Sequence, residues 1–117
     1  TAGLIEVALK EYISDRTQWQ RMLKNQLIEG INLLDKKQEM LELLENDLRE
    51  YESLDNEIIT INYPVNEYPK KVKSLGFDKM EEIAGRLWGI KGQYLMFDDG
   101  SVLNIRKHNG YKISLEV

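Results

Sequence analysis

The sequence Gly85–Val117, GRLWGIKGQYLMFDDGSVLNIRKHNGYKISLEV, predicts three β-strands separated by two tight turns. An Asp-Gly step at residues 99–100 and an Asn-Gly step at 109–110 mark the turns, because such turns need a residue that accepts a positive φ angle. Pattern and turn chemistry agree here better than elsewhere in the chain. We therefore take this stretch as the centre of the fold.

The first turn allows two registers. A two-residue loop at the Asp-Gly step sets Phe97 opposite Val102, whereas a three-residue loop over 98–100 sets Phe97 opposite Ser101. Since a slip of one residue sends each side chain to the other face of the sheet, only one register can be native.

The second turn favours one register. A two-residue loop would place Lys107 against Lys112, and like charges directly opposite each other are destabilising. A three-residue loop over 108–110 avoids this pair and sets Ile105 opposite Ile113. We predict the three-residue loop, with its glycine in the left-handed conformation.

The composition is that of a globular protein, with 42% hydrophobic and 31% charged residues in a chain of 117. This length suits one domain, or one and a half, with a real core. No apolar run approaches the roughly 18 residues of a membrane span, and no signal peptide is visible. We therefore expect a cytoplasmic protein with no membrane partner. Without cysteine, the chain has neither disulfides nor thiolate zinc sites.

Charge is distributed unevenly along the chain. Residues 1–56 hold 7 Lys/Arg and 12 Asp/Glu, net −5, whereas residues 57–117 hold 9 and 8, net +1. Nucleic-acid binding needs clustered cations. The first half therefore does not look like a nucleic-acid surface, and a basic patch is expected only in the second half.

The first half has a helical pattern. Residues 3–14 show the i, i+3, i+4, i+7 spacing of one apolar face. Thr17 and Gln20 suit a capping box that opens a second helix. A third helix is predicted from Asp35 to about Tyr51. The residues that the second helix would bury are Trp19, Leu23 and Leu27, and the apolar stripe of the third is Leu41, Leu44, Leu48 and Tyr51.

The second half has a β pattern. A strand is predicted over 58–63, a short strand over 70–74 and a helical turn over 78–84. The spacing of Gly85, Gly89 and Gly92 suits bends or bulges in a curved sheet. The chain is therefore predicted to be α+β. A helical N-terminal half of two or three helices precedes a small, curved, mostly antiparallel β-sheet or half-open barrel. The predicted regions are 1–55 and 56–117.

Two candidate sites stand out, each with an ordinary structural alternative. A segment with interleaved rings and cations suits single-stranded nucleic acid, because rings stack on bases and cations follow phosphates. Lysines that protect a sheet edge would give the same pattern. The residues of this segment are Tyr63, Tyr68, Lys70, Lys71 and Lys73. The second site is Glu6, a carboxylate beside an apolar helix face that could bind a divalent metal or pair with Lys10 at i+4.

The segments AGLIEVALK, DRTQWQRMLKNQ, YPVNEYPKKVKSL, GIKGQYLMFDDGSVLNIR and GYKISLEV resemble the middle to C-terminal part of an uncharacterised bacterial family of unknown function. Longer members of that family carry a cysteine-rich, zinc-binding-like segment and a region similar to GIY-YIG endonucleases. By this resemblance Glu6, in GLIEVALK, matches the catalytic glutamate that holds a divalent metal, Mg or Mn, in those enzymes. The tyrosine-bearing strands and the catalytic arginine would lie before Thr1.

The resemblance implies that this chain is the trailing, C-terminal fragment of a metal-dependent nuclease-like parent and does not cut nucleic acid by itself. Residues 1–55 would then hold the end of a GIY-YIG-like module with connecting helices. The first functional hypothesis is a non-catalytic region whose β module contacts nucleic acid or the N-terminal part of the parent. The second is a protein-interaction or structural module without a nucleic-acid role, in which the third helix packs on a partner or a second copy.

Overall fold

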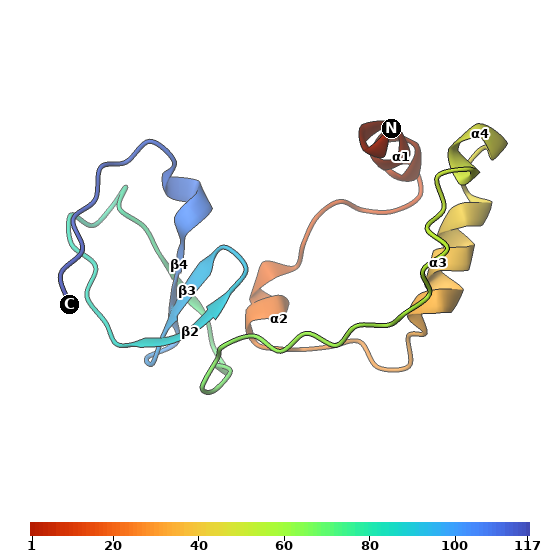
Figure 1. Cartoon of the computed structure of the whole chain (residues 1–117). Coiled ribbons are helices and arrows are strands. Elements are labelled where there is room, and N and C mark those ends of the chain that lie inside the picture. The colour runs from red at the N-terminus through yellow and green to blue at the C-terminus, as the bar shows by residue number, and fades with distance from the viewer. The chain divides into compact units, whose positions relative to one another are not determined.

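The computed structural model describes residues 1–117 and shows an α+β chain with four α-helices and one four-stranded sheet (Figure 1). The chain forms two compact units. The helical unit comprises Thr1–Gln18 and Leu27–Thr60, and the β unit comprises Trp19–Gln26 and Ile61–Val117. None of the helices has both the length and the apolar character that crossing a bilayer requires.

The helical unit contains α1 (Ala2–Leu9), α3 (Leu33–Glu42) and the short α4 (Asn46–Arg49). The helix expected over 3–14 is therefore shorter than predicted and ends at Leu9. The helix expected from Asp35 to Tyr51 begins earlier, at Leu33, and is interrupted between α3 and α4. It begins earlier because the Asn32 side chain accepts hydrogen bonds from the first backbone amides of α3. It is interrupted because the Arg49 guanidinium donates to the carbonyls of Leu44 and Glu42, which would otherwise lack partners at the end of α3.

The β unit contains α2 (Trp19–Leu23) and the strands β1 (Lys73–Leu75), β2 (Leu87–Lys91), β3 (Tyr94–Phe97) and β4 (Ser101–Asn104). The strand order is β1-β4-β3-β2. β1 runs parallel to β4, and the other pairs are antiparallel. The sheet is thus mixed and open.

The β3–β4 turn has the three-residue register. Met96 pairs with Val102 and Leu95 with Leu103, which puts residues 98–100 in the loop. The amide of Gly100 donates to the Phe97 carbonyl at 3.1 Å, and Gly100 has a φ of 85°. A glycine in this conformation is typical of three-residue hairpin loops.

The second predicted hairpin was wrong. Residues Ile105–His108 form a 3-10 helix, and residues 111–117 pair with no strand. The buried His108 ring explains the difference: its Nδ1 lies 2.9 Å from the Asn104 carbonyl oxygen, and its Nε2 accepts from the Phe77 amide at 3.0 Å. These bonds hold the chain in a tight turn where the predicted strand would have continued straight.

Two other predicted elements, a strand and a helical turn, also need correction. The strand expected over 58–63 is absent, and only the bridge between Val65 and Gly89 follows it. The expected helical turn over 78–84 is absent as well. A turn between β2 and β3 was missed: Gly92, with a φ of 58°, was interpreted as a bend and opens a two-residue hairpin loop. The register does shift between Leu87 and Gly89, as a β-bulge would cause.

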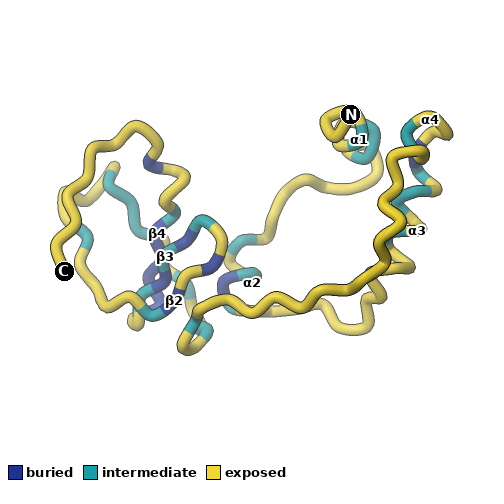
Figure 2. Tube along the Cα trace, in the orientation of Figure 1, coloured by how far each residue is buried: buried dark blue, intermediate teal, exposed yellow.

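The core of the β unit lies between α2 and one face of the sheet (Figure 2). Leu23 of α2 is fully buried, and the ring of Trp19 stacks on Tyr94 with centroids 5.8 Å apart. Through these contacts α2 packs on the sheet, although it is far from the strands in the sequence. The residues of this core are Leu23, Tyr94, Met96 and Val102, with Trp19, Met22, Val65, Tyr68 and Val72 packed around them.

Gly100 joins β1 to the hairpin, and we expect its substitution to separate them. A Cβ there would lie 2.6 Å from the Lys71 carbonyl oxygen, and the positive φ is strained for any L side chain. Gly100→Ala should destabilise the β unit by about 1–3 kcal/mol, measured by urea denaturation. Gly110→Ala is the matched control, because Gly110 has a φ of 84° but no atom near the added methyl group. Equal losses in both variants would contradict a role for the close approach.

Candidate nucleic-acid interface

The two tyrosines predicted to stack on bases flank an internal cation. The Nζ atom of Lys91 lies 5.0 Å from the ring centroid of Tyr63 and 4.9 Å from that of Tyr68. It also donates to the Met22 carbonyl at 2.9 Å and to Asn25 Oδ1 at 3.4 Å. One face of each tyrosine is therefore engaged within the β unit. Tyr63 remains 41% exposed.

Lys91 itself is 6% exposed, and burial lowers the pKa of its ammonium group. Its position follows from strand alternation: Lys91 pairs with Tyr94 and points to the same face as the core. Lys91 was not among the residues predicted for the candidate site. The only sequence signal for its burial was the alternation of side chains along β2, which puts Lys91 on the same face as Gly89.

Lys70, Lys71 and Lys73 lie exposed along β1 and the residues before it. β1 forms one edge of the sheet and is held to the hairpin by the Lys73 amide, which donates to the Gly100 carbonyl at 3.1 Å. None of the three lysines takes part in an ion pair, since the four ion pairs of the chain lie within the helical unit. Their ammonium groups are therefore available to an anionic partner.

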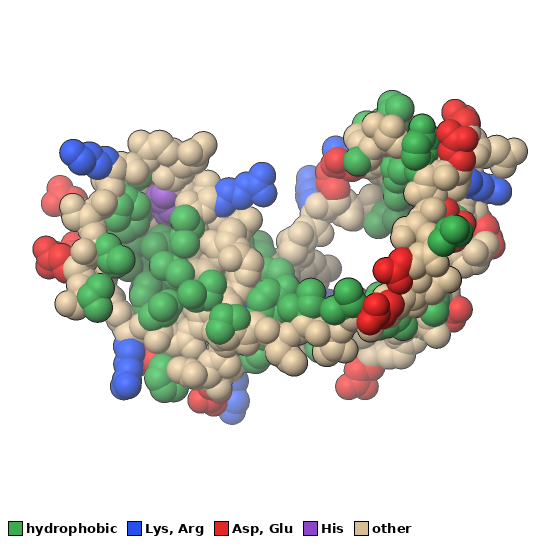
Figure 3. Space-filling view, viewed as in Figure 1, with side chains coloured by type: hydrophobic (Ala, Val, Ile, Leu, Met, Phe, Trp, Pro, Cys, Tyr) green, Lys and Arg blue, Asp and Glu red, His purple; other side chains and the backbone are tan.

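The two units carry opposite charge. The β unit holds 11 Lys/Arg and 7 Asp/Glu, net +4, whereas the helical unit holds 5 and 13, net −8. Figure 3 shows the acidic side chains gathered over the helices and Lys and Arg side chains projecting from the β unit. The asymmetry is larger than a division of the sequence at residue 56 indicates, because Trp19–Gln26 contributes Arg21 and Lys24 to the β unit and Glu57 belongs to the helical unit.

The aspartates of the β3–β4 turn do not form an acidic site. Asp99 Oδ1 accepts hydrogen bonds from the Ser101 hydroxyl and, at 2.9 Å, from the Ser101 amide. These bonds, with a weaker effect of nearby Lys73, lower the pKa of the Asp99 carboxyl. The carboxylate thus stabilises the turn.

Arg86 and Trp88 form a second pair of cation and ring that the sequence analysis did not single out. The guanidinium carbon of Arg86 lies 5.5 Å from the Trp88 ring centroid. Lys91 is buried, whereas Arg86, which directly precedes β2, is exposed. The i, i+2 spacing on a strand was the available signal, since such residues share a face.

Glu6 lies on α1, and its side chain is 70% exposed. Its carboxylate is 4.0 Å from Lys10 Nζ, which also pairs with Asp15 at 3.3 Å. Mg²⁺ and Mn²⁺ favour several oxygen ligands in octahedral geometry, and no group of three or more potential metal ligands surrounds Glu6. The predicted metal role of Glu6 would therefore need further oxygen ligands.

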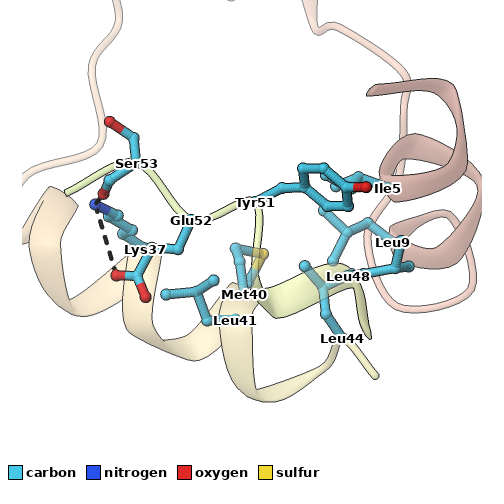
Figure 4. Close-up of a pocket in the computed structure, with 10 residues that line it drawn as sticks. All are labelled: Ile5, Leu9, Lys37, Met40, Leu41, Leu44, Leu48, Tyr51, Glu52 and Ser53. Atoms are coloured by element: carbon cyan, nitrogen blue, oxygen red, sulfur yellow. Dashed lines mark hydrogen bonds and ion pairs between the residues drawn. The ribbon is translucent and has the colours of Figure 1, made fainter. Parts of the chain in front are cut away.

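The helical unit contains an apolar pocket of about 330 Å³ (Figure 4). The pocket is lined by the predicted stripe, Leu41, Leu44, Leu48 and Tyr51, together with Ile5 and Leu9 of α1. At one end Lys37 pairs with Glu52 at 3.8 Å, and its ammonium group also reaches the backbone at Ser53 and Asp55. The charges of Lys37 and Glu52 are thus paired with each other, and the rest of the lining is mainly apolar.

Comparison with known proteins gives one match. The model of the family described as "Protein of unknown function (DUF2797)" matches residues 1–113. None of the curated proteins and none of the solved structures compared with the chain matches it. The matched range includes the helical unit and almost all of the β unit.

Proposed function

Since the chain belongs to that family, whose description assigns no activity, we propose from its own geometry that the β unit binds single-stranded nucleic acid. The observation that best supports this proposal is the net charge of +4 in the β unit, in which Lys70, Lys71 and Lys73 are exposed and take part in no ion pair. Exposed cations release condensed counterions when they contact phosphates, and this release drives binding.

The tyrosines fit this role in a specific way. Lys91 occupies one face of each ring, so only an outer face of Tyr63 is free to receive a base. Bases stack on such faces with little sequence preference. Tyr68 lies within the packed edge of the core and acts by holding the segment that carries the lysines. The expected ligand is therefore a single strand bound with weak sequence preference.

The relation to GIY-YIG-like proteins is part of the same proposal. In it, this chain is a non-catalytic C-terminal region of a bacterial, cytoplasmic parent with an upstream cysteine-rich segment. Glu6 would contribute one carboxylate to a divalent metal site whose other ligands come from the parent. Support comes from the resemblance around GLIEVALK and from the family match, together with the exposure of Glu6.

Reversing the three lysines is expected to abolish most of the binding. Lys70→Glu/Lys71→Glu/Lys73→Glu should weaken binding of a fluorescent 20-nucleotide single strand on the order of 100-fold at low salt. The slope of log K against log salt should become about two units shallower, since each single-strand contact contributes about 0.7. Fluorescence anisotropy across a salt series measures both quantities.

The matched control reverses the same charge on the helical unit. Lys10→Glu/Arg16→Glu/Lys36→Glu changes the net charge equally at exposed positions, and Glu6→Gln tests the proposed metal residue. Both controls should bind as the unmodified chain does. An equal loss in the control triple variant would show that overall charge matters and not this edge, and a chain that binds no oligonucleotide would end the proposal.

The alternative is an interaction module, and exposed apolar side chains favour it. Leu4 and Val7 of α1 are 63% and 66% exposed, on a helix that is apolar on more than one face. Concentration-dependent dimerisation in sedimentation experiments, without nucleic-acid binding, would support this alternative over the first proposal.

A further inference from the structure

The Arg86 side chain lies over the Trp88 ring and has a second face directed away from it. The guanidinium carbon is 5.5 Å from the ring centroid, and Arg86 is exposed whereas Trp88 is partly buried. A guanidinium is planar and stacks with one face on an aromatic ring while the other face can receive a second flat group. The indole thus holds Arg86 in place as a platform.

Backbone hydrogen bonds connect this platform to the lysine segment through the β3–β4 turn. The Asp98 amide donates to the Arg86 carbonyl at 3.1 Å, which brings β2 to one side of the turn. On the other side, the Gly100 carbonyl accepts from the Lys73 amide at 3.1 Å. Gly100 also lies directly against the Lys71 backbone. Cations from two distant segments therefore lie at the same end of the sheet, on the two sides of the β3–β4 turn.

We propose that Arg86, held by Trp88, is a stacking position for an unpaired nucleobase. This inference rests on the proposed function and extends it: Lys71 and Lys73 contact phosphates, and Arg86 receives a base of the same strand. Arginine planes and aromatic rings are the groups on which proteins stack splayed-out bases. A paired base in a duplex does not present its face, so the site selects single strands.

The test compares a single strand with one of equal length and charge that lacks bases. The unmodified chain should bind an oligothymidine 12-mer about tenfold more tightly than an abasic 12-mer, because stacking adds to the phosphate contacts. Arg86→Lys keeps the charge and removes the planar group. It should lose most of this tenfold preference while its salt slope stays unchanged. Arg106→Lys, an exposed conservative change on the 3-10 helix, is the control and should keep the preference.

A second readout reports on the ring directly. Oligothymidine should quench tryptophan fluorescence in the unmodified chain, and Trp88→Phe should remove that change, because Trp19 is stacked on Tyr94 in the core. An Arg86→Lys variant that keeps the base preference, or an unmodified chain that binds both strands equally, overturns the stacking position and leaves the phosphate contacts standing. Failure to bind either strand overturns the proposed function as well.

Discussion

Replacing Leu23 by alanine is expected to destabilise the β unit by about 2–5 kcal/mol, the usual cost of truncating a fully buried leucine. Leu23 has no exposed surface and packs with Tyr94, Met96 and Val102. The loss is large because small domains are stable by only about 5–15 kcal/mol. A substantial part of the unit's stability therefore depends on a five-residue helix outside the main run of its sequence.

Leu27→Ala is the matched control for this substitution. Leu27 is four residues further along the chain and 73% exposed, so its truncation should change stability by no more than about 0.5 kcal/mol. Hydrogen exchange of the β3 and β4 amides, measured by mass spectrometry, reports on the β unit alone. Faster exchange in Leu23→Ala and unchanged exchange in Leu27→Ala is expected. Similar rates in both variants would show that α2 does not support the sheet.

The contrast between these two leucines shows the limit of prediction from sequence. Trp19, Leu23 and Leu27 were all predicted to be buried, because each suits one apolar face of a single helix. The helix ends at Leu23, and Asn25 adopts a φ of 55° at its end, so Leu27 falls outside it. Lys91 stabilises this end by donating to the Met22 carbonyl. A contact across 69 residues cannot be recognised from local periodicity.

The hairpins show the same division between local and distant causes. A hairpin at the Asp99-Gly100 step was predicted because Gly100 supplies a positive φ that the turn itself requires, but the choice between a two-residue and a three-residue loop came only from the structure. Gly110 also has a positive φ, at 84°, yet no hairpin follows it. There the ring of His108 directs the chain through its contact with the Phe77 amide, 31 residues away. Turn chemistry could be predicted, but not which turn joins paired strands.

The candidate site was predicted only in its charged part. Lys70, Lys71 and Lys73 are exposed at a sheet edge, as their composition indicated. The role of Tyr63 and Tyr68 beside Lys91 could not be predicted, because it depends on three segments that meet only in the folded unit. Lys91, whose side chain contacts all three segments, should therefore be important for the stability of the β unit.

Lys91→Ala is expected to cost about 3 kcal/mol. It removes a hydrogen bond from a charged donor, worth about 1.5–3 kcal/mol, together with two cation–π contacts of about 0.5–1 kcal/mol or more each. The relief of burying a charge offsets part of this sum. Lys91→Met retains the aliphatic stem and should cost less, and Lys107→Ala, at an exposed position, should be nearly neutral. Urea denaturation measures the three free energies of unfolding.

The pH dependence gives a separate test with a defined sign. Burial lowers the pKa of Lys91 in the folded chain below its ordinary value of 10.5. Between the folded and unfolded pKa values the unfolded chain binds more protons, so the free energy of unfolding rises with pH through that window. Below it the cost of burying the charge is fully present. The stability of the unmodified chain relative to Lys91→Met should therefore increase as the pH approaches 10.5. A constant difference would mean that the cation–π and carbonyl contacts fully replace the water that the ammonium group loses, and a decreasing difference would mean that these contacts favour the charged form more than water does.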